Sequence, residues 1–183
     1  TFAGESTGTA IDEHAPNINR FGEAAWQTEG GGLVTVHADG YAYWNGTAVQ
    51  DGDEASYGPI LSTDGFVQAT ITPYNSGGTL RAPALGYRFN QFNDEGLFTY
   101  LDCESNQIVT RREEGDGTIN AVDTRAFTCA SGTAYVLRIT FIGNALTIYV
   151  DGVQQGDPIT NTFHQTDGES VALKWVIDGT GGA

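Results

Sequence analysis

The stretch YVLRITFIGNALTIYVDGVQQG, residues 135–156, decides the fold class of this chain. Large apolar residues occupy alternate positions on both sides of a turn, at Tyr135, Leu137, Ile139 and Phe141 and then at Leu146, Ile148 and Val150. This period of two is typical of strands with one buried face. Gly143 and Asn144 between the two runs tolerate the positive φ of a tight turn. The stretch therefore predicts an antiparallel hairpin, followed by a second turn at Asp151–Gly152.

The rest of the chain repeats this pattern. Strand-like segments lie between turn dipeptides such as Asp39–Gly40 and Asn45–Gly46, at residues 33–38, 41–44, 66–72, 85–89, 97–101, 107–112 and 171–177. No long segment has helical periodicity. The pattern predicts an all-β protein built as a sandwich or a barrel. We expect residues 1–183 to form one domain, with residues 1–32 wrapping the sheets and residues 178–183 forming a flexible tail.

The charge balance of the chain indicates which classes of binding partner are unfavourable. The 183 residues include 8 basic and 23 acidic side chains, which give a net charge of −15. Such a field repels nucleic-acid phosphates and anionic membrane surfaces. No apolar run is long enough for a membrane span, and no signal segment opens the chain. Because the sequence contains no Met, Thr1 is not an initiator, and we expect a processed chain or a piece of a longer one.

The two cysteines, Cys103 and Cys129, lie near predicted strand ends. One disulfide between them would indicate an oxidising, extracellular setting and would stabilise the fold by roughly 3 kcal/mol. Two buried free thiols are the alternative that the sequence leaves open.

Four segments carry a resemblance to a known group. The opening FAGESTGTAIDEHAPN followed by Trp26, together with GFVQATITP, LGYRFNQFNDEGLFTYL and YVLRITFIGNALTIYVDGV, resembles laminin-G-like or concanavalin A-like sandwich domains. These occur in phage structural proteins and in bacterial surface and secreted proteins. The resemblance covers roughly residues 2 to 155. It implies a two-sheet antiparallel jelly roll used for binding or surface display. Ile11, Asn17 and the cysteine pair depart from the usual pattern.

Catalytic motifs are absent. The Glu-x-Asp-x-x-Glu strand of related glucanases does not occur, and Asp102 and Glu104 flank Cys103 at a strand end, where a solvated rim is expected. The histidines, His14, His37 and His164, have no partner spacing for nucleophilic or metal chemistry. Arg111–Arg112 followed by Glu113–Glu114 resembles a self-compensating surface patch. The sequence predicts a protein that is not an enzyme.

Two groups of residues are candidates for binding. Asp51 and Asp53 lie with Glu54 in one loop and are candidate ligands of a structural calcium ion, against the alternative of a merely polar loop. For a glycan, the candidates are aromatic and amide or carboxylate side chains in or beside predicted loops, namely Tyr57, Tyr74, Asn93 and Asp94. The alternative is that these aromatics cover the edge of the core.

Function is expected to reside in loops and surfaces. The first hypothesis is a non-catalytic virion component, such as a capsid decoration or tail protein, that contacts neighbouring subunits and host glycans. The alternatives are a secreted carbohydrate-binding module and a subunit of an extracellular filament. The corresponding location is the virion surface or the extracellular space. The partners would be structural subunits, including copies of the chain in a homo-oligomer, or cell-surface glycans.

Overall fold

The computed structural model describes residues 9–10, 26–29, 34–36, 42–44, 54–57, 64–76, 79–90, 95–166 and 170–179. Every regular element within these residues is a strand, which confirms the all-β prediction. No helix among the described residues is long and apolar enough to cross a membrane. The strands are β1 (Thr9–Ala10), β2 (Trp26–Glu29), β3 (Val34–Val36), β4 (Ala42–Trp44), β5 (Glu54–Tyr57), β6 (Gly65–Ile71), β7 (Tyr74–Ser76), β8 (Thr79–Asn90), β9 (Glu95–Asp102), β10 (Gln107–Glu113), β11 (Ile119–Ala126), β12 (Tyr135–Ile142), β13 (Ala145–Val150), β14 (Val153–Gln154), β15 (Ile159–Thr160) and β16 (Ser170–Gly179).

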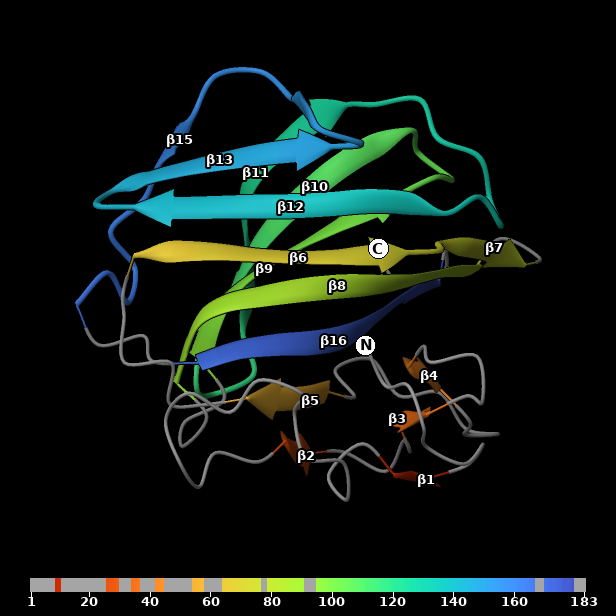
Figure 1. The fold of residues 1–183 in the computed structure, drawn as a ribbon, viewed down its shortest axis with the longest axis horizontal. Coiled ribbons are helices and arrows are strands. Elements are labelled where there is room, and N and C mark those ends of the chain that lie inside the picture. Colours follow the sequence, from red (N-terminus) through yellow and green to blue (C-terminus); the bar gives the residue numbers. More distant parts are fainter. Residues whose placement is uncertain are drawn as a thin grey trace.

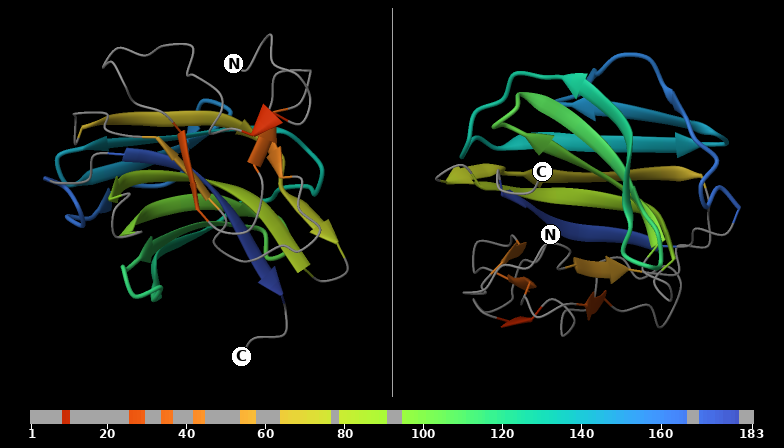
Figure 2. Two further views of the ribbon diagram at one scale, coloured as in Figure 1. Left: turned by 90° about the horizontal axis from the view of Figure 1, so that it is seen from below. Right: turned by 180° about the vertical axis from the view of Figure 1, so that it is seen from behind.

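Two antiparallel sheets form the sandwich. The large sheet has the order β11-β10-β9-β8-β16-β5-β2, with β7 paired to one end of β8. The small sheet has the order β14-β13-β12-β6, with β15 also paired to β13. A further three-stranded sheet joins β1, β3 and β4. In Figure 1 β12 and β13 lie in front of β10 and β11, and the view from behind in Figure 2 shows β10 and β11 in front.

The predicted hairpin is present as β12 and β13. Their register pairs Ile142 with Ala145 across the turn, and Gly143 has the positive φ of 55° that such a turn requires. The next turn also has two positive φ values, at Asp151 and Gly152, and leads into β14. Both turns therefore lie where the sequence predicts them.

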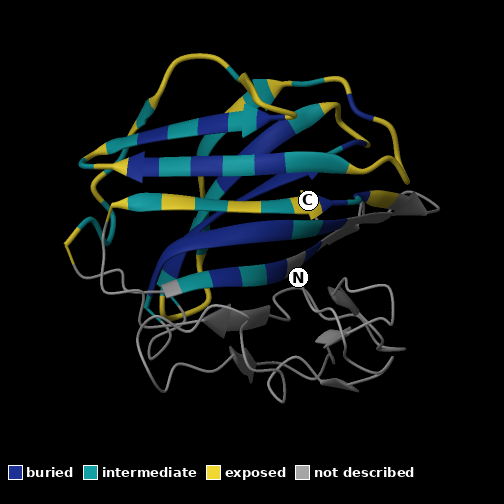
Figure 3. Cartoon of the chain, viewed as in Figure 1, coloured by how far each residue is buried: buried dark blue, intermediate teal, exposed yellow. Residues whose placement is uncertain are grey.

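One core fills the space between the two sheets. In Figure 3 buried and less buried positions alternate along β12 and β13, as expected for strands with one face inward. The buried cluster consists of Ile71, Leu85, Tyr87, Leu97, Leu101, Cys103, Ile108, Cys129, Leu137, Ile139, Phe141, Leu146, Ile148 and Val150. Cys103 and Cys129 form a disulfide within this cluster. The disulfide thus links the two ends of the segment that contains β10 and β11, and it anchors both ends in the core.

Strand β8 is longer than the segment 85–89 that the sequence predicts, and it passes through Pro83. Along one side β8 pairs with β16 over its whole length. On the other side it pairs with β7 at residues 79–81 and with β9 only from Ala84 onward. Pro83 falls in the gap between these two pairings, so its missing N–H leaves no ladder bond unmade on that side.

Arg88 interrupts the regular pattern of β8. Its φ is 51°, and the β8–β9 register shifts between Tyr87 and Asn90. The buried guanidinium donates hydrogen bonds to the backbone carbonyl oxygens of Gly143 and Asn161. Burial lowers the pKa of Arg88 from its ordinary value. The Arg88 side chain thus connects the large sheet to the turn between β12 and β13 in the small sheet through hydrogen bonds.

Other segments also differ from the sequence-based expectation, among them the following. Strand β11 lies in the connection between the cysteines, where no strand was predicted, because an edge strand reading INAVDTRA lacks a continuous apolar alternation. Within residues 1–32, β2 pairs with β5 and forms an edge of the large sheet. Strand β16 continues to Gly179, two residues into the segment 178–183 that was expected to be a flexible tail.

Candidate functional site

Each sheet of the sandwich has an outer face that points away from the core between the sheets. In the middle of the large sheet, on β8, β9, β10 and β16, this face includes Ala82, Ala84, Phe98, Tyr100, Val109, Arg111, Glu113, Ala172, Lys174 and Val176. All of these are buried except Arg111, which is half-buried, whereas Ala121 and Thr124 on the edge strand β11 are exposed. Two of its three charged side chains, Glu113 and Lys174, are buried, so we do not take this face as the candidate site.

A buried ion pair lies on this outer face of the large sheet. Lys174 of β16 donates a hydrogen bond to the Glu113 carboxylate of β10, and both side chains are almost fully buried. Strands β8 and β9 lie between β16 and β10, so the pair spans two strands, and the residue beside Lys174 on β8 is the small Ala84. Its ammonium nitrogen lies 5.4 Å from the centroid of the Phe98 ring. The pair is a structural element, because separating two buried opposite charges is strongly unfavourable.

The predicted surface patch at residues 111–114 is therefore wrong. Consecutive strand residues point to opposite faces, so the run of four charges is divided between two environments. Glu113 is buried against Lys174, and the Arg111 guanidinium lies 5.6 Å from the Tyr100 ring centroid on the same face. Arg112, on the other side of the strand, pairs with Glu114.

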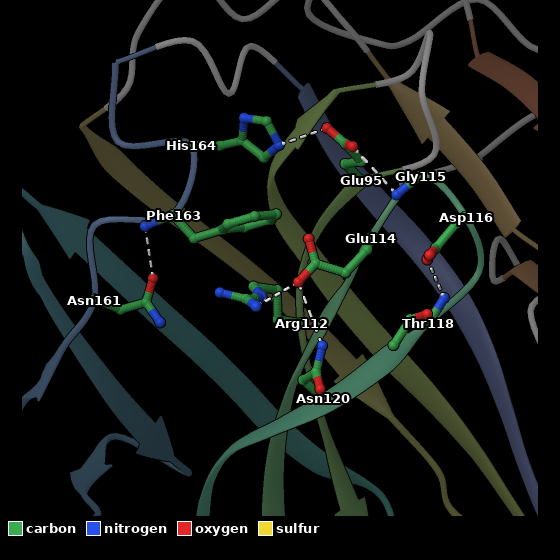
Figure 4. A network of polar contacts seen from close by, with 10 residues as sticks. All are labelled: Glu95, Arg112, Glu114, Gly115, Asp116, Thr118, Asn120, Asn161, Phe163 and His164. Carbon is green, nitrogen blue, oxygen red and sulfur yellow. Dashed lines mark hydrogen bonds and ion pairs between the residues drawn. The ribbon is translucent and has the colours of Figure 1, made fainter.

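A second polar cluster lies where the connection before β16 meets the start of β9 and the turn between β10 and β11 (Figure 4). His164, from the connection before β16, lies 3.1 Å from Glu95 at the start of β9, measured between Nε2 and Oε2. The other oxygen of Glu95 accepts a hydrogen bond from the backbone N–H of Gly115 in the turn between β10 and β11. Glu95 therefore joins the connection before β16 to this turn.

The remaining groups of this cluster are also bonded to one another. The Arg112 guanidinium pairs with Glu114 and lies 4.8 Å from the ring centroid of Phe163. Asn120 donates to Glu114 at 3.3 Å. Hydrogen bonds from Thr118 lower the pKa of Asp116. Figure 4 shows these side chains turned toward one another. The carboxylates of this cluster already accept hydrogen bonds from, or pair with, other groups of the protein. We therefore interpret the cluster as a structural link between the connection before β16 and the turn between β10 and β11.

The outer face of the small sheet has the opposite character. Its strand residues are Phe66, Gln68 and Thr70 of β6, Val136, Arg138, Thr140 and Ile142 of β12, and Ala145, Thr147 and Tyr149 of β13. None of these residues is acidic, although the chain carries a net charge of −15. All of them are half-buried or exposed, and 59% of Phe66 and 65% of Ile142 are exposed.

Arg138 lies at the centre of this outer face. The register places it directly between Gln68 of β6 and Tyr149 of β13. Its guanidinium carbon lies 4.3 Å from the ring centroid of Phe66 and 5.8 Å from that of Tyr149. Two aromatic rings and one planar cation thus form a continuous strip across three strands, bordered by hydroxyl and amide groups such as those of Thr140, Thr147 and Gln68.

This strip is the candidate functional site. Stacking surfaces beside a few hydrogen-bonding groups are what binding sites for sugars and other small polar molecules share. No group of three or more potential metal ligands occurs among the described residues. The arrangement offers stacking, hydrogen bonding and one positive charge.

The residues proposed from the sequence occupy other places. Tyr74 is 56% exposed, at the start of β7 and beside the turn that contains Gly132. Tyr57 is the last residue of β5, where it pairs with Val171 of β16. Asn93 and Asp94, like the calcium candidates Asp51 and Asp53, lie outside the described residues.

Of the four glycan candidates, Tyr57 and Tyr74 lie on the strands β5 and β7. The roles of all four as ligand contacts stay predictions.

The sequence does indicate that the side chains of Phe66 and Tyr149 point to solvent. In residues 66–71 the inward positions are Val67, Ala69 and Ile71, so Phe66 falls in phase with polar residues. Tyr149 likewise falls in phase with Thr147 in β13. An aromatic residue in the polar phase of a strand points to solvent, and two of them flank Arg138.

No protein-family model matches the chain, and neither does any curated protein sequence. Solved structures do match it. The carbohydrate-binding module CBM66 from Bacillus subtilis superposes with a TM-score of 0.63 at 17% identity, over 84% of this chain and 92% of that module. The β-glucanase of Bacillus licheniformis superposes with a TM-score of 0.54 at 13% identity, over 97% and 88% of the two chains. This chain has a concanavalin A-like jelly-roll fold.

A third match extends the same comparison. A Bacillus subtilis protein of unknown function with a galectin-like fold superposes with a TM-score of 0.53 at 11% identity, over 94% of this chain and 96% of that one. The jelly roll is thus shared by a binding module, an enzyme and a protein without an assigned function. At these identities the similarity establishes the fold, and function has to be argued from the surfaces.

Proposed function

We propose that this protein is a non-catalytic carbohydrate-binding protein that holds a glycan chain on the outer face of its small sheet. The observation that carries the proposal is the strip of Phe66, Arg138 and Tyr149 across three strands. The C–H faces of sugar rings pack on aromatic rings, and the ring hydroxyls bond to amide and hydroxyl groups of the kind that Gln68, Thr140 and Thr147 supply.

Two further observations support this function. The fold is that of a carbohydrate-binding module, among other proteins. The Cys103–Cys129 disulfide supports an oxidising, extracellular location, where polysaccharides are found.

The non-catalytic part of the proposal rests on the state of the carboxylates. Retaining glycosidases need two carboxylates about 5–5.5 Å apart, one acting as the nucleophile and the other as the acid. In this chain Glu113 is bonded to Lys174, Glu114 to Arg112 and Glu95 to His164. These carboxylates are occupied by structural contacts, which supports binding without cleavage.

The experiment is affinity electrophoresis of the intact protein in gels that contain a panel of neutral and anionic polysaccharides. We expect at least one polysaccharide to retard the protein, and we expect Phe66→Ala to weaken the retardation about tenfold. Tyr74→Ala is the matched control, because Tyr74 is about as exposed as Phe66 but lies at the β7 end of the sandwich. Equal effects of the two variants, or no retardation by any polysaccharide, would refute the proposed site.

A second candidate function is assembly, as a virion surface component, such as a capsid decoration or tail protein, or as a filament subunit. The observation in its favour is that large apolar side chains, Phe66, Ile142 and Val153, are more than half exposed in the small sheet. A neighbouring subunit would cover them. Sedimentation velocity over a wide concentration range distinguishes the two functions, because assembly predicts oligomers that Ile142→Asp disrupts.

A further inference from the structure

Arg138 differs from four other basic side chains. Three of them form the ion pairs Arg112–Glu114, Arg125–Asp123 and Lys174–Glu113, and Arg88 donates hydrogen bonds to backbone carbonyl oxygens. Arg138 forms no ion pair with any carboxylate in the described part of the chain. Its Nε, like those of Arg88 and Arg112, is enclosed and has no hydrogen-bond partner there. In a protein with 23 acidic residues, an arginine that pairs with no acid among the described residues needs an explanation.

The two neighbouring rings fix the position of this cation. Phe66 lies close to the Arg138 guanidinium, at 4.3 Å from the ring centroid, and Tyr149 lies on the next strand at 5.8 Å. Stacking on aromatic rings orders the planar guanidinium without neutralising its charge. A guanidinium that is held in this way loses little further conformational freedom when it binds an anion.

The surroundings of Arg138 also favour an anion. The outward positions of β6, β12 and β13 carry no Asp or Glu. The acidic residues at the strand ends are engaged, since Asp64 accepts a hydrogen bond from the backbone N–H of Gly143 and Asp151 accepts one from that of Val136. A carboxylate beside Arg138 therefore meets no acidic side chain at the outward positions of these three strands.

We propose that this face binds polysaccharides whose sugar residues carry a carboxylate. In this arrangement the guanidinium of Arg138 binds the carboxylate and the ring of Phe66 packs against the sugar. A guanidinium can bind a carboxylate through two parallel N–H···O bonds, which neutral sugars cannot accept. The inference rests on the proposed carbohydrate-binding function and narrows it to one class of ligand.

The net charge of −15 repels a polyanion at long range, but this repulsion is screened. The Debye length is about 8 Å at physiological ionic strength and shorter in more concentrated salt. The contact between Arg138 and a carboxylate is much shorter than that. The face thus provides local selectivity for a carboxylate within an otherwise repelling protein.

The test compares two forms of one polysaccharide. Affinity electrophoresis is run in gels with polygalacturonate, in which each sugar carries a carboxylate, and with its fully methyl-esterified form, which is neutral but has the same backbone. A chelator is present throughout, because divalent cations would bridge an acidic protein to an acidic polysaccharide. The variants are Arg138→Met, Arg138→Lys and Phe66→Ala, and the thermal transition of each is recorded as a check of folding.

We expect polygalacturonate to retard the wild-type protein at least tenfold more strongly than the ester does. Arg138→Met should remove this preference, and Arg138→Lys should keep only part of it, because an ammonium group lacks the planar fork. Phe66→Ala should weaken binding of both forms.

The two proposals fail in different ways. Equal retardation by the acid and the ester, or an unchanged preference in Arg138→Met, overturns the carboxylate inference and leaves carbohydrate binding intact. Retardation by a sulfated galactan in place of the polyuronate also overturns it. Absence of retardation by any polysaccharide in the panel overturns both.

Discussion

The outer faces of the two sheets use similar residues in opposite ways. On the large sheet, Phe98 lies beneath Lys174, and the charge of Lys174 is compensated by Glu113. On the small sheet, Phe66 lies beside Arg138, whose charge is uncompensated in the described part of the chain. Both faces contain an aromatic–cation contact, but one is buried and the other is open. The comparison teaches that burial and charge compensation separate a structural face from a binding face.

The largest expected effect comes from breaking the buried pair. Lys174→Met leaves the Glu113 carboxylate buried without its cation, and we expect the free energy of unfolding to fall by about 3–5 kcal/mol. Urea denaturation with the disulfide intact measures the loss. Arg138→Met is the matched change on the small sheet and should cost less than about 1 kcal/mol. Similar losses in the two variants would remove the distinction between the faces.

Between the two sheets, Tyr87 links stability to pH. Burial raises the pKa of Tyr87 to about 12 from 10.0, and its hydroxyl lies 3.1 Å from that of Thr99. The unfolded chain loses this proton near pH 10 and the folded protein only near pH 12. The contribution of the Tyr87 proton to stability is therefore complete below pH 10 and is lost as the pH rises to 12, a decline of roughly 3 kcal/mol.

Comparison of Tyr87→Phe with the wild-type protein isolates this effect. We expect the variant to lack the extra decline in the free energy of unfolding between pH 10 and pH 12. Guanidinium denaturation at several pH values measures the slope. If both proteins decline in parallel, the Tyr87 proton does not contribute.

A smaller effect tests how tightly the outer face of the large sheet is packed. A methyl group added at Gly86 would lie 2.6 Å from the Cβ of Ala172 on the adjacent strand, so Gly86→Ala should cost about 1–3 kcal/mol. Gly65→Ala in β6 is the control, because its added methyl would meet Phe141 at an ordinary 3.7 Å. Thermal unfolding should show a lower transition temperature only for the first variant.

The smallest effect on stability is expected where the effect on binding is largest. Phe66→Ala and Tyr149→Ala change side chains that are only partly buried, and each should alter the free energy of unfolding by less than about 1 kcal/mol. Both should weaken glycan binding about tenfold in the electrophoresis described above. A variant that loses stability and binding together would indicate that the strip is structural.

Much of the fold could be predicted from the sequence because it depends on local order. The alternation in residues 135–150 and the turn residues Gly143 and Asp151 specify a hairpin without reference to the rest of the chain. Strand β11 and the first half of β8 escaped prediction. Their pairing is decided by neighbours distant in sequence, as the position of Pro83 between two partner strands shows.

The candidate site was less accessible to prediction. Tyr57, Tyr74, Asn93 and Asp94 were chosen because they lie in or near loops, where binding residues are common. The strip of Phe66, Arg138 and Tyr149 lies on strands and comes from residues up to 83 positions apart, 149 minus 66. Strand phase indicates that each of the three points outward, but only the order of strands in the sheet makes them neighbours.

The sequence by itself determined the fold class of this protein through strands of period two and tight turns, and it set a net negative charge that repels nucleic-acid phosphates. The tertiary structure decided whether each charged side chain is buried or accessible and whether it has a partner of opposite charge. Glu113 and Arg138 are both ordinary strand residues in the sequence, yet one is buried against Lys174 and the other lies open between two rings. The physical reason is that side-chain direction follows from local periodicity, whereas solvent access and charge compensation depend on which distant strands lie alongside.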